Sequence, residues 1–258
     1  MCILLIAYGA DPEYPLIIAA NRDEAYRRPA MAAHWWEDGS GILAGRDLRA
    51  GGTWLGVSRD GRFAAITNHW GTEPPPAGAP SRGVLVRNYL SGGMSGMEYM
   101  KELKSSGELY AGFNLIFGTV SGLYYFHNSG GGNIGALKKG VHAVSNEVLD
   151  TPWPKVVTAK SMLTRMISEK RVSGPALFDL LNLSEEAELQ KNGDLPEDQR
   201  RRLSRSSIRV CFPVFGTRSS TVVLCRGNGT LGFMEKNYYP PGIVRFSWNI
   251  GREIGTLH

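Results

Sequence analysis

The residues at the start of this sequence could carry out nucleophilic chemistry. Cys2 follows the initial methionine directly and precedes the apolar run ILLIAY. Removal of Met1 would leave one residue that carries both a thiol and an α-amine, and an amine with a pKa of about 8 can accept the proton of the thiol. Two other interpretations compete with this one. Cys2 could be a small apolar side chain in a core strand, or it could belong to a targeting signal.

A targeting signal fits the N-terminal residues poorly. No basic segment precedes the apolar run, which ends at Tyr8 and is followed by the turn-forming stretch GADPEYP. No apolar run approaches the roughly 20 residues that cross a bilayer. The three cysteines are odd in number and form no C-x-x-C pair, which argues against a disulfide framework and for a reducing compartment. We therefore expect a cytoplasmic protein without a transmembrane segment.

Polar residues that could assist the thiol follow three apolar runs. They are Asn21, Arg22 and Asp23 after LIIAA, Asn68 after FAAIT, and Asn146 after VHAVS. A carboxylate can hold the α-amine, and an asparagine amide can donate to an oxyanion, where losing one such donor costs on the order of 10²-fold in rate. A terminal thiol with these residue types is typical of amide hydrolysis by an N-terminal nucleophile. Turn-forming asparagines and surface ion pairs are the ordinary structural alternatives.

Two arginines near the other end of the sequence are candidates for a cation beside the thiol. Arg209 begins the apolar run IRVCF, where a buried charge needs a partner, and Arg218 lies in the turn-like stretch FGTRSST. A nearby arginine favours the thiolate form of a cysteine. Cys211 and Cys225 lie in apolar runs that we predict to be strands, so we expect Cys2 to be the reactive thiol.

Residues next to Asn68 are candidates for ligand contacts. His69 and Trp70 follow it directly, and the proline-rich segment 71–80 comes next. Trp70 and Arg82 flank this segment and would supply an apolar face and a cation, which suit an acyl substrate or a flat anionic ligand such as haem. The segment itself could form a wall or lid, or an ordinary surface crossing. The five histidines show no metal spacing, and a single histidine beside a tryptophan is more often packed than ligating. We therefore expect no metal site and no cofactor.

Alternation along the strand that ends in the polar cluster predicts two faces. Asn21 and Asp23 should share one face, while Arg22 should point to the other, if the strand continues that far. We assign substrate contacts to Asn21, Arg22, His69 and Trp70.

The composition bounds the class of protein and its partners. A chain of 258 residues, with 42% apolar and 21% charged residues, can build a sizeable core, and we expect a single domain over 1–258. The formal charge is +5, but the basic residues are scattered. The densest basic run, QRRRLSR at 199–205, is more typical of a solvated face than of a nucleic-acid surface. Small anionic molecules are the expected partners, and the oligomeric state stays open.

Strands are expected in two blocks, with helices between them and within the second half. The predicted strands are 2–8, 14–21, 41–45, 53–58, 63–68, 111–119, 122–128 and 141–146, with further strands in 208–248. The predicted helices are 81–90, 95–103, 153–170 and 174–182, and a polar segment follows at 184–207. Strict alternation of strand and helix is absent, so the pattern favours an α+β fold with antiparallel sheets and helices on the outside.

Several blocks of the sequence resemble the NRDE family, also called the transport and Golgi organisation family. The blocks are MCILLIAY, PLIIAANRDE, RRPA, ILAGRDLRAGGTWLGVS, FAAITN, FNLI, SNEVLDTPWPKV and GTRSSTV. This resemblance covers nearly the whole chain. It implies links to Golgi organisation, mitochondrial and lipid metabolism, and haem trafficking, as for eukaryotic members.

The order of elements also resembles the cysteine branch of the N-terminal nucleophile hydrolases, such as bile-salt hydrolases and penicillin V acylases. That resemblance implies a four-layer αββα sandwich of two antiparallel sheets. It implies these roles: Cys2 as nucleophile, Asp23 as the acid that holds the amine, Asn68 as oxyanion donor, Asn146 as positioning residue, and Arg209 or Arg218 as the late arginine. One departure is clear, because the acylase pattern has an arginine three residues before its aspartate, where this sequence has Ala20.

The expected function is hydrolysis of a linear amide bond in an acylated small molecule by Cys2 after removal of Met1. The alternative is a non-catalytic protein of the NRDE family that binds or traffics haem or an acyl carrier.

Overall fold

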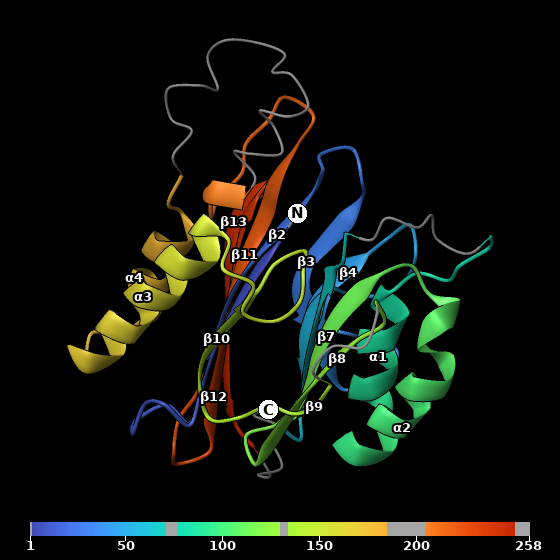
Figure 1. The fold of residues 1–258 in the computed structure, drawn as a ribbon, viewed down its shortest axis with the longest axis horizontal. Coiled ribbons are helices and arrows are strands. Elements are labelled where there is room, and N and C mark those ends of the chain that lie inside the picture. The colour runs from blue at the N-terminus through green and yellow to red at the C-terminus, as the bar shows by residue number, and fades with distance from the viewer. Residues whose placement is uncertain (1, 71–76, 130–133, 185–204, 251–258) are drawn as a thin grey trace, which may run out of the picture.

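Two antiparallel β-sheets face each other in the computed structural model, and helices cover the outer face of each sheet (Figure 1). The structure describes residues 2–70, 77–129, 134–184 and 205–250. This arrangement is the expected α+β sandwich with four layers. Met1, most of the proline-rich segment (71–76) and most of the polar segment (185–204) lie outside the described residues.

The first sheet has six strands, and β1 and β2 lie inside it. Its strands, in spatial order, are β10 (Gly140–Val144), β1 (Ile3–Tyr8), β2 (Leu16–Ala25), β11 (Phe215–Cys225), β12 (Thr230–Tyr238) and β13 (Pro241–Asn249). The outer face carries α3 (Pro154–Ser168) and α4 (Gly174–Leu181). Strands that are covered on both faces are apolar at every position, which is why ILLIAY and LIIAA lack alternation.

The second sheet has seven strands. In spatial order they are β3 (Ala30–Trp35), β4 (Ile42–Asp47), β5 (Leu55–Ser58), β6 (Phe63–Asn68), β7 (Phe113–Thr119), β8 (Gly122–His127) and β9 (Gly135–Ala136). Helices α1 (Gly83–Ser91) and α2 (Gly96–Ser106) cover its outer face, and a short 3₁₀ turn, Gly107–Leu109, follows α2. None of the helices in the described part of the chain is long and apolar enough to span a bilayer.

Three apolar clusters hold the layers together. Alternate residues of β1 divide between two of them: Leu4 and Ile6 pack between the sheets, whereas Ile3 and Leu5 pack under α3 and α4. The third cluster lies between the seven-stranded sheet and the helices α1 and α2. Both faces of the inner strands are thus buried, and polar residues inside the sandwich need partners of their own.

Some expected boundaries were wrong. The strand β3 was not expected from the sequence, because AMAAHW has weak strand propensity and its pairing with β4 shifts between Met31 and His34. Cys211 does not lie in a strand as expected, since residue 211 forms only an isolated bridge with Gly216. The strand β2 continues through its polar residues to Ala25, because β11 pairs with it along that length.

Candidate functional site

The topology gathers most of the candidate site residues at one edge of the sandwich. Strand β1 begins there, and its antiparallel neighbours β2 and β10 end there. Strand β6 of the other sheet ends at the same place, because Asn146 Nδ2 donates to the carbonyl of Asn68 at 2.9 Å and Trp70 N donates to the carbonyl of Asn146 at 2.8 Å. The structure therefore brings Cys2, Asp23, Asn68 and Asn146 to one end of the fold.

Cys2 is half-buried immediately before β1. Its carbonyl accepts a hydrogen bond from Ser145 Oγ at 2.6 Å. Ile3 pairs with Asn21, so the register continued by one residue places Cys2 opposite Arg22. Burial lowers the pKa of Arg22 and of Arg82, and interaction with Cys2 acts in the opposite direction on both. Two cations therefore interact electrostatically with Cys2, an arrangement that suits an anionic ligand at this edge.

Asp23 is buried on the opposite face of β2. Its Oδ1 accepts from Thr217 Oγ1 at 2.7 Å, and its Oδ2 has no hydrogen-bond partner among the described residues. Burial raises the pKa of Asp23, and Lys155, Thr217 and Arg22 counteract that effect. Lys155, near the start of α3, is itself fully buried. A carboxylate in this position can hold a nearby amine, and the positive charge of that amine would lower the pKa of Asp23.

The predicted alternation along β2 is confirmed. Asn21 points to the helical layer, where its Nδ2 donates to the carbonyls of Leu181 and Ile208 at 2.8 and 2.9 Å. Its Oδ1 accepts from Ser220 Oγ at 2.6 Å. Arg22 points between the sheets, with its guanidinium 4.1 Å from the ring of Trp54. Both amide hydrogens of Asn21 are used within the protein, whereas Arg22 faces a cavity.

The two asparagines differ in exposure. Asn146 is fully buried and holds the backbone of Asn68. Asn68 is exposed at the end of β6, and the hydrogen bonds found among the described residues leave its side-chain amide unused. Asn68 is therefore placed to meet a ligand, and Asn146 is placed to position Asn68. The role of Asn68 as oxyanion donor and that of Asn146 in positioning the substrate and the α-amine stay predictions.

His69 and Trp70 follow Asn68 directly but differ in their ring contacts and exposure. The ring of His69 stacks on that of His127 at 6.3 Å, and burial lowers the pKa of both imidazoles. Trp70 is 37% exposed and packs against Trp153 at 5.3 Å between ring centroids. The described residues contain no group of three or more side chains that could hold a metal ion.

The two late arginines have structural partners. Arg218 Nη1 donates to the carbonyls of Ala25, Tyr26 and Arg28, and its Nη2 donates to that of Tyr239. These bonds fasten the chain just after β2. Arg209 Nη1 donates to Asn182 Oδ1 at 2.8 Å, and its guanidinium lies 4.4 Å from the ring of Tyr238. Which of them contacts a substrate stays open.

Two residues near the site were not assigned a place beside Cys2 or Asp23 from the sequence. Arg82, just before α1, was expected only as a cation that flanks the proline-rich segment. It interacts electrostatically with Cys2 and donates to the carbonyl of Gly112 at 2.7 Å. Lys155 was not expected at the site and interacts with Asp23. The sequence carries one signal for Lys155, because it occupies the apolar stripe of its helix with Val156, Ala159 and Leu163.

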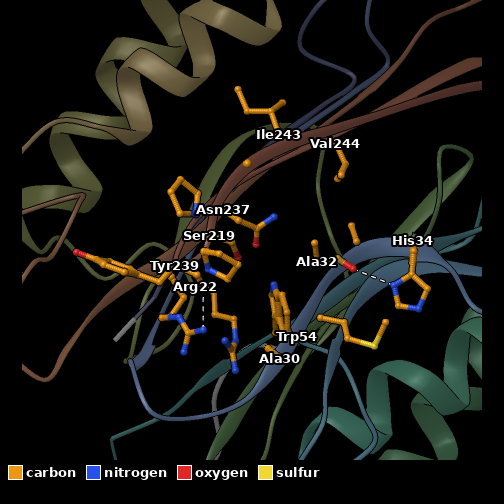
Figure 2. Close-up of a pocket in the computed structure, with 16 residues that line it drawn as sticks. Arg22, Ala30, Ala32, His34, Trp54, Ser219, Asn237, Tyr239, Ile243 and Val244 are labelled. Atoms are coloured by element: carbon orange, nitrogen blue, oxygen red, sulfur yellow. Dashed lines mark hydrogen bonds between the residues drawn. The ribbon is translucent and has the colours of Figure 1, made fainter.

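A cavity of about 510 Å³ lies between β3 of one sheet and β12 and β13 of the other. Figure 2 shows Arg22, Ser219 and Tyr239 close together on one side of it, with Trp54 beside Arg22 and Ile243 and Val244 farther along. Because Arg22 also faces Cys2, the cavity adjoins the thiol.

The layered fold is that of the N-terminal nucleophile hydrolases. A mutant conjugated bile acid hydrolase from Clostridium perfringens matches the structure with a TM-score of 0.56 and 10% sequence identity, covering 100% of both chains. An N-acylethanolamine-hydrolyzing acid amidase orthologue from Caenorhabditis elegans matches with a TM-score of 0.52 and 10% identity, covering 86% of this chain and 92% of the other. At such identities the likeness concerns the fold alone.

Sequence comparison gives the family. The family model described as Transport and Golgi organisation 2 matches residues 1–240. The chain is 33% identical over 270 residues to the Transport and Golgi organization 2 homolog of Mus musculus, covering 96% of this chain and 97% of the relative. It is 35% identical over 258 residues to the corresponding homolog of Bos taurus, covering 92% and 93%. The chain belongs to the Transport and Golgi organisation 2 family, which confirms the resemblance to the NRDE family.

Proposed function

We propose that this protein hydrolyses a linear amide bond in an acylated small molecule, with Cys2 as an N-terminal nucleophile after removal of Met1. One observation carries the proposal. It is the position of Cys2 just before β1, in electrostatic interaction with Arg22 and Arg82, at the edge where Asp23 and the exposed Asn68 also lie. The fold that this chain shares with amide-hydrolysing proteins supports the same chemistry.

The residues divide the steps of the reaction among them. The α-amine of Cys2 takes the thiol proton, and the sulfur attacks the amide carbonyl. The side-chain amide of Asn68, positioned by Asn146, donates to the oxyanion of the tetrahedral intermediate. The intermediate collapses to a thioester as the α-ammonium protonates the leaving amine. Water then hydrolyses the thioester and restores the thiol, while Asp23 holds the α-amine throughout.

Intact mass and turnover test this proposal. The protein, expressed without an N-terminal tag, should lack the mass of Met1 and should hydrolyse members of a panel of N-acyl amides. Cys2→Ala should abolish turnover, and Asn68→Ala should lower kcat by on the order of 10²-fold with little change in thermal stability. A fully retained Met1, or equal turnover by Cys2→Ala, would contradict the proposal.

Thiol labelling provides a second test that needs no substrate. Brief iodoacetamide treatment at neutral pH, followed by peptide mapping, should modify Cys2 first. Cys225 is buried, and burial raises the pKa of its thiol. Cys211 is half-buried, as Cys2 is, and accepts a hydrogen bond from Tyr26 at 3.7 Å. It has no α-amine of its own to take the thiol proton, so it should react more slowly than Cys2. Faster labelling of Cys211 would count against Cys2 as the nucleophile.

The second candidate function is non-catalytic binding or trafficking of haem or an acyl carrier. The exposed ring of Trp70, stacked on Trp153 next to Asn68, supports this candidate. Trp70→Ala should then weaken haem or acyl-carrier binding while leaving the melting temperature almost unchanged, and Cys2→Ala should leave binding intact. A large drop in melting temperature with unchanged binding would make Trp70 a packing residue only.

A further inference from the structure

The cavity between the sheets lies along a row of paired residues that begins at Cys2. Strand pairing places Arg22 opposite Ser219, Ser219 opposite Asn237, and Asn237 opposite Gly242. Paired residues share one face of a sheet, and neighbouring strands are about 4.8 Å apart. All of these residues except Cys2 line the cavity. The floor of the cavity thus starts beside the thiol and leads away from it across the six-stranded sheet.

Polar groups at the inner end of this floor have unused hydrogen-bonding capacity. Arg22 is 7% exposed, its guanidinium lies 3.5 Å from Asp47, and it makes no hydrogen bond to another described residue. Asp47 is held more closely by Arg28 Nε at 2.5 Å. Ser219 is 2% exposed, and its Oγ has no hydrogen-bond partner within the described chain. A ligand oxygen placed here would accept hydrogen bonds from both residues. These bonds would offset the free-energy cost of burying the two side chains without partners.

The charged side chains that line the cavity are cationic. Its lining includes Arg22 and Arg218 and no aspartate or glutamate. The anion closest to Arg22 is Asp47, which lies outside the lining and is held by Arg28. Glu235, a buried acid of β12, has a pKa raised by burial, and its oxygens accept from Ala33 N at 2.7 Å and from Thr221 Oγ1 at 3.4 Å. The cavity therefore favours an anionic group over a cationic one.

The outer part of the cavity is apolar and unfilled. Met31, Tyr239 and Ile243 line it and are 45%, 47% and 46% exposed, and Trp54 forms part of the wall (Figure 2). Large apolar side chains exposed around a concavity are typical of a ligand site, and ligand sites commonly enclose roughly 300 to 1,000 Å³. The cavity volume of about 510 Å³ falls in this range.

We propose that this cavity binds a carboxylate with a compact apolar body. The carboxylate lies against Arg22 and Ser219, and the apolar body lies between Trp54 and Ile243. This inference rests on the proposed function and sharpens it. The substrates selected are amides in which one half carries a carboxylate, held one to two strand spacings from the bond that Cys2 attacks.

Calorimetric titration with 4-phenylbutyrate, a soluble carboxylate that contains no amide, tests the inference on the full chain. It should bind at least tenfold more tightly than the neutral 4-phenylbutanol and more tightly than the cationic 4-phenylbutylamine. Ser219→Ala should weaken binding by about 10- to 150-fold, the range expected for one hydrogen bond to a charged group. The folded state should tolerate that change, because Ser219 Oγ bonds to no described residue.

A matched pair of variants tests the position of the ligand. Ile243→Glu places a carboxylate at the cavity wall, and Val157→Glu places the same group on the exposed face of α3, where Val157 is 53% exposed. Ile243→Glu should weaken 4-phenylbutyrate binding more than tenfold, and Val157→Glu should not change it. Equal effects of the two variants, equal affinity for the alcohol, or no effect of Ser219→Ala would overturn the inference.

The same experiment separates this inference from the proposed function. Cys2→Ala should bind 4-phenylbutyrate as tightly as the native chain does, since the thiol only adjoins the cavity. Binding without any Cys2-dependent amide hydrolysis would overturn the proposed function and support the cavity ligand. Hydrolysis of amides with no preference for a carboxylate would overturn the cavity ligand alone.

Discussion

The two helical layers attach to their sheets in different ways. Helices α1 and α2 pack on the seven-stranded sheet through aromatic rings, with the Tyr99 ring 5.3 Å from that of Phe117. Helices α3 and α4 pack on the six-stranded sheet partly through polar anchors. Asn21 holds the end of α4, and Lys160 of α3 donates to Asp150 at 2.7 Å.

Because of this difference, substitutions in the two helical layers should affect stability and the candidate site to different degrees. Asn21, Asp23 and the buried Lys155 all lie between the six-stranded sheet and its helices, so this layer forms one wall of the candidate site. The α1/α2 layer contributes mainly apolar packing, apart from Arg82 just before α1. Changes in the α1/α2 layer should therefore affect folding, whereas changes in the α3/α4 layer should also affect charge and the site.

The largest effect on stability is expected from Phe117→Ala. Phe117 is fully buried under α1 and α2, and truncation of a buried phenylalanine costs about 3–5 kcal/mol through lost burial and a cavity. Denaturant unfolding should show this loss, and the labelling rate of Cys2 in the folded protein should not change. Leu109→Ala is the control, since Leu109 is 62% exposed. Faster labelling of Cys2 in Phe117→Ala would show that the layers are not separable.

A smaller loss is expected from Asn21→Leu. The change leaves the carbonyls of Leu181 and Ile208 without the amide that donates to them, at a cost of about 2–4 kcal/mol. Hydrogen exchange should show loss of protection in α4 before any other helix. The matched control is Asn88→Leu on the exposed face of α1, which should change stability by less than about 0.5 kcal/mol. Equal losses of stability in Asn21→Leu and Asn88→Leu would contradict the difference between the two helical layers.

The smallest effect is a pH dependence in the attachment of α3. Burial raises the pKa of Asp150, but hydrogen bonds from His142 and Lys160 outweigh burial and lower it to about 2. Because the folded pKa lies below the unfolded value of 3.8, the stabilisation is present above pH 3.8 and is lost as pH falls toward 2. After allowance for solvent screening, it amounts to about 1–2 kcal/mol.

Asp150→Asn measures this contribution without disturbing the backbone, because asparagine tolerates the positive φ of 62° at this position. The stability difference from the native chain should be greatest near pH 5 to 6 and should shrink toward pH 2. It should also shrink as pH rises above 6.5, because hydrogen bonding to Asp150 raises the pKa of His142. The stabilisation from His142 is complete below the pKa of histidine in the unfolded chain. It is lost as the pH rises through the pKa of His142 in the folded protein. A pH-independent difference would contradict the assignment.

Much of the fold could be predicted because its signals are local. The run ILLIAY is apolar at every position and short, which is typical of a strand covered on both faces, and the repeat of apolar residues in 153–170 is helical. The strand β3 could not be predicted in this way. It is held partly by Glu235, more than 200 positions away, whose carboxylate accepts from Ala33 N.

For the candidate site, the sequence by itself determined which chemistry is available. It places a thiol at residue 2 and polar residues at the ends of apolar runs, and alternation along β2 separates Asp23 from Arg22, because these properties depend on residue type and on near neighbours. Only the tertiary structure decided which cations meet the thiol. Arg22 and Arg82 interact electrostatically with Cys2, whereas Arg218 is bound by backbone carbonyls. Strand register and the packing of one sheet on the other set these distances between residues far apart in the chain.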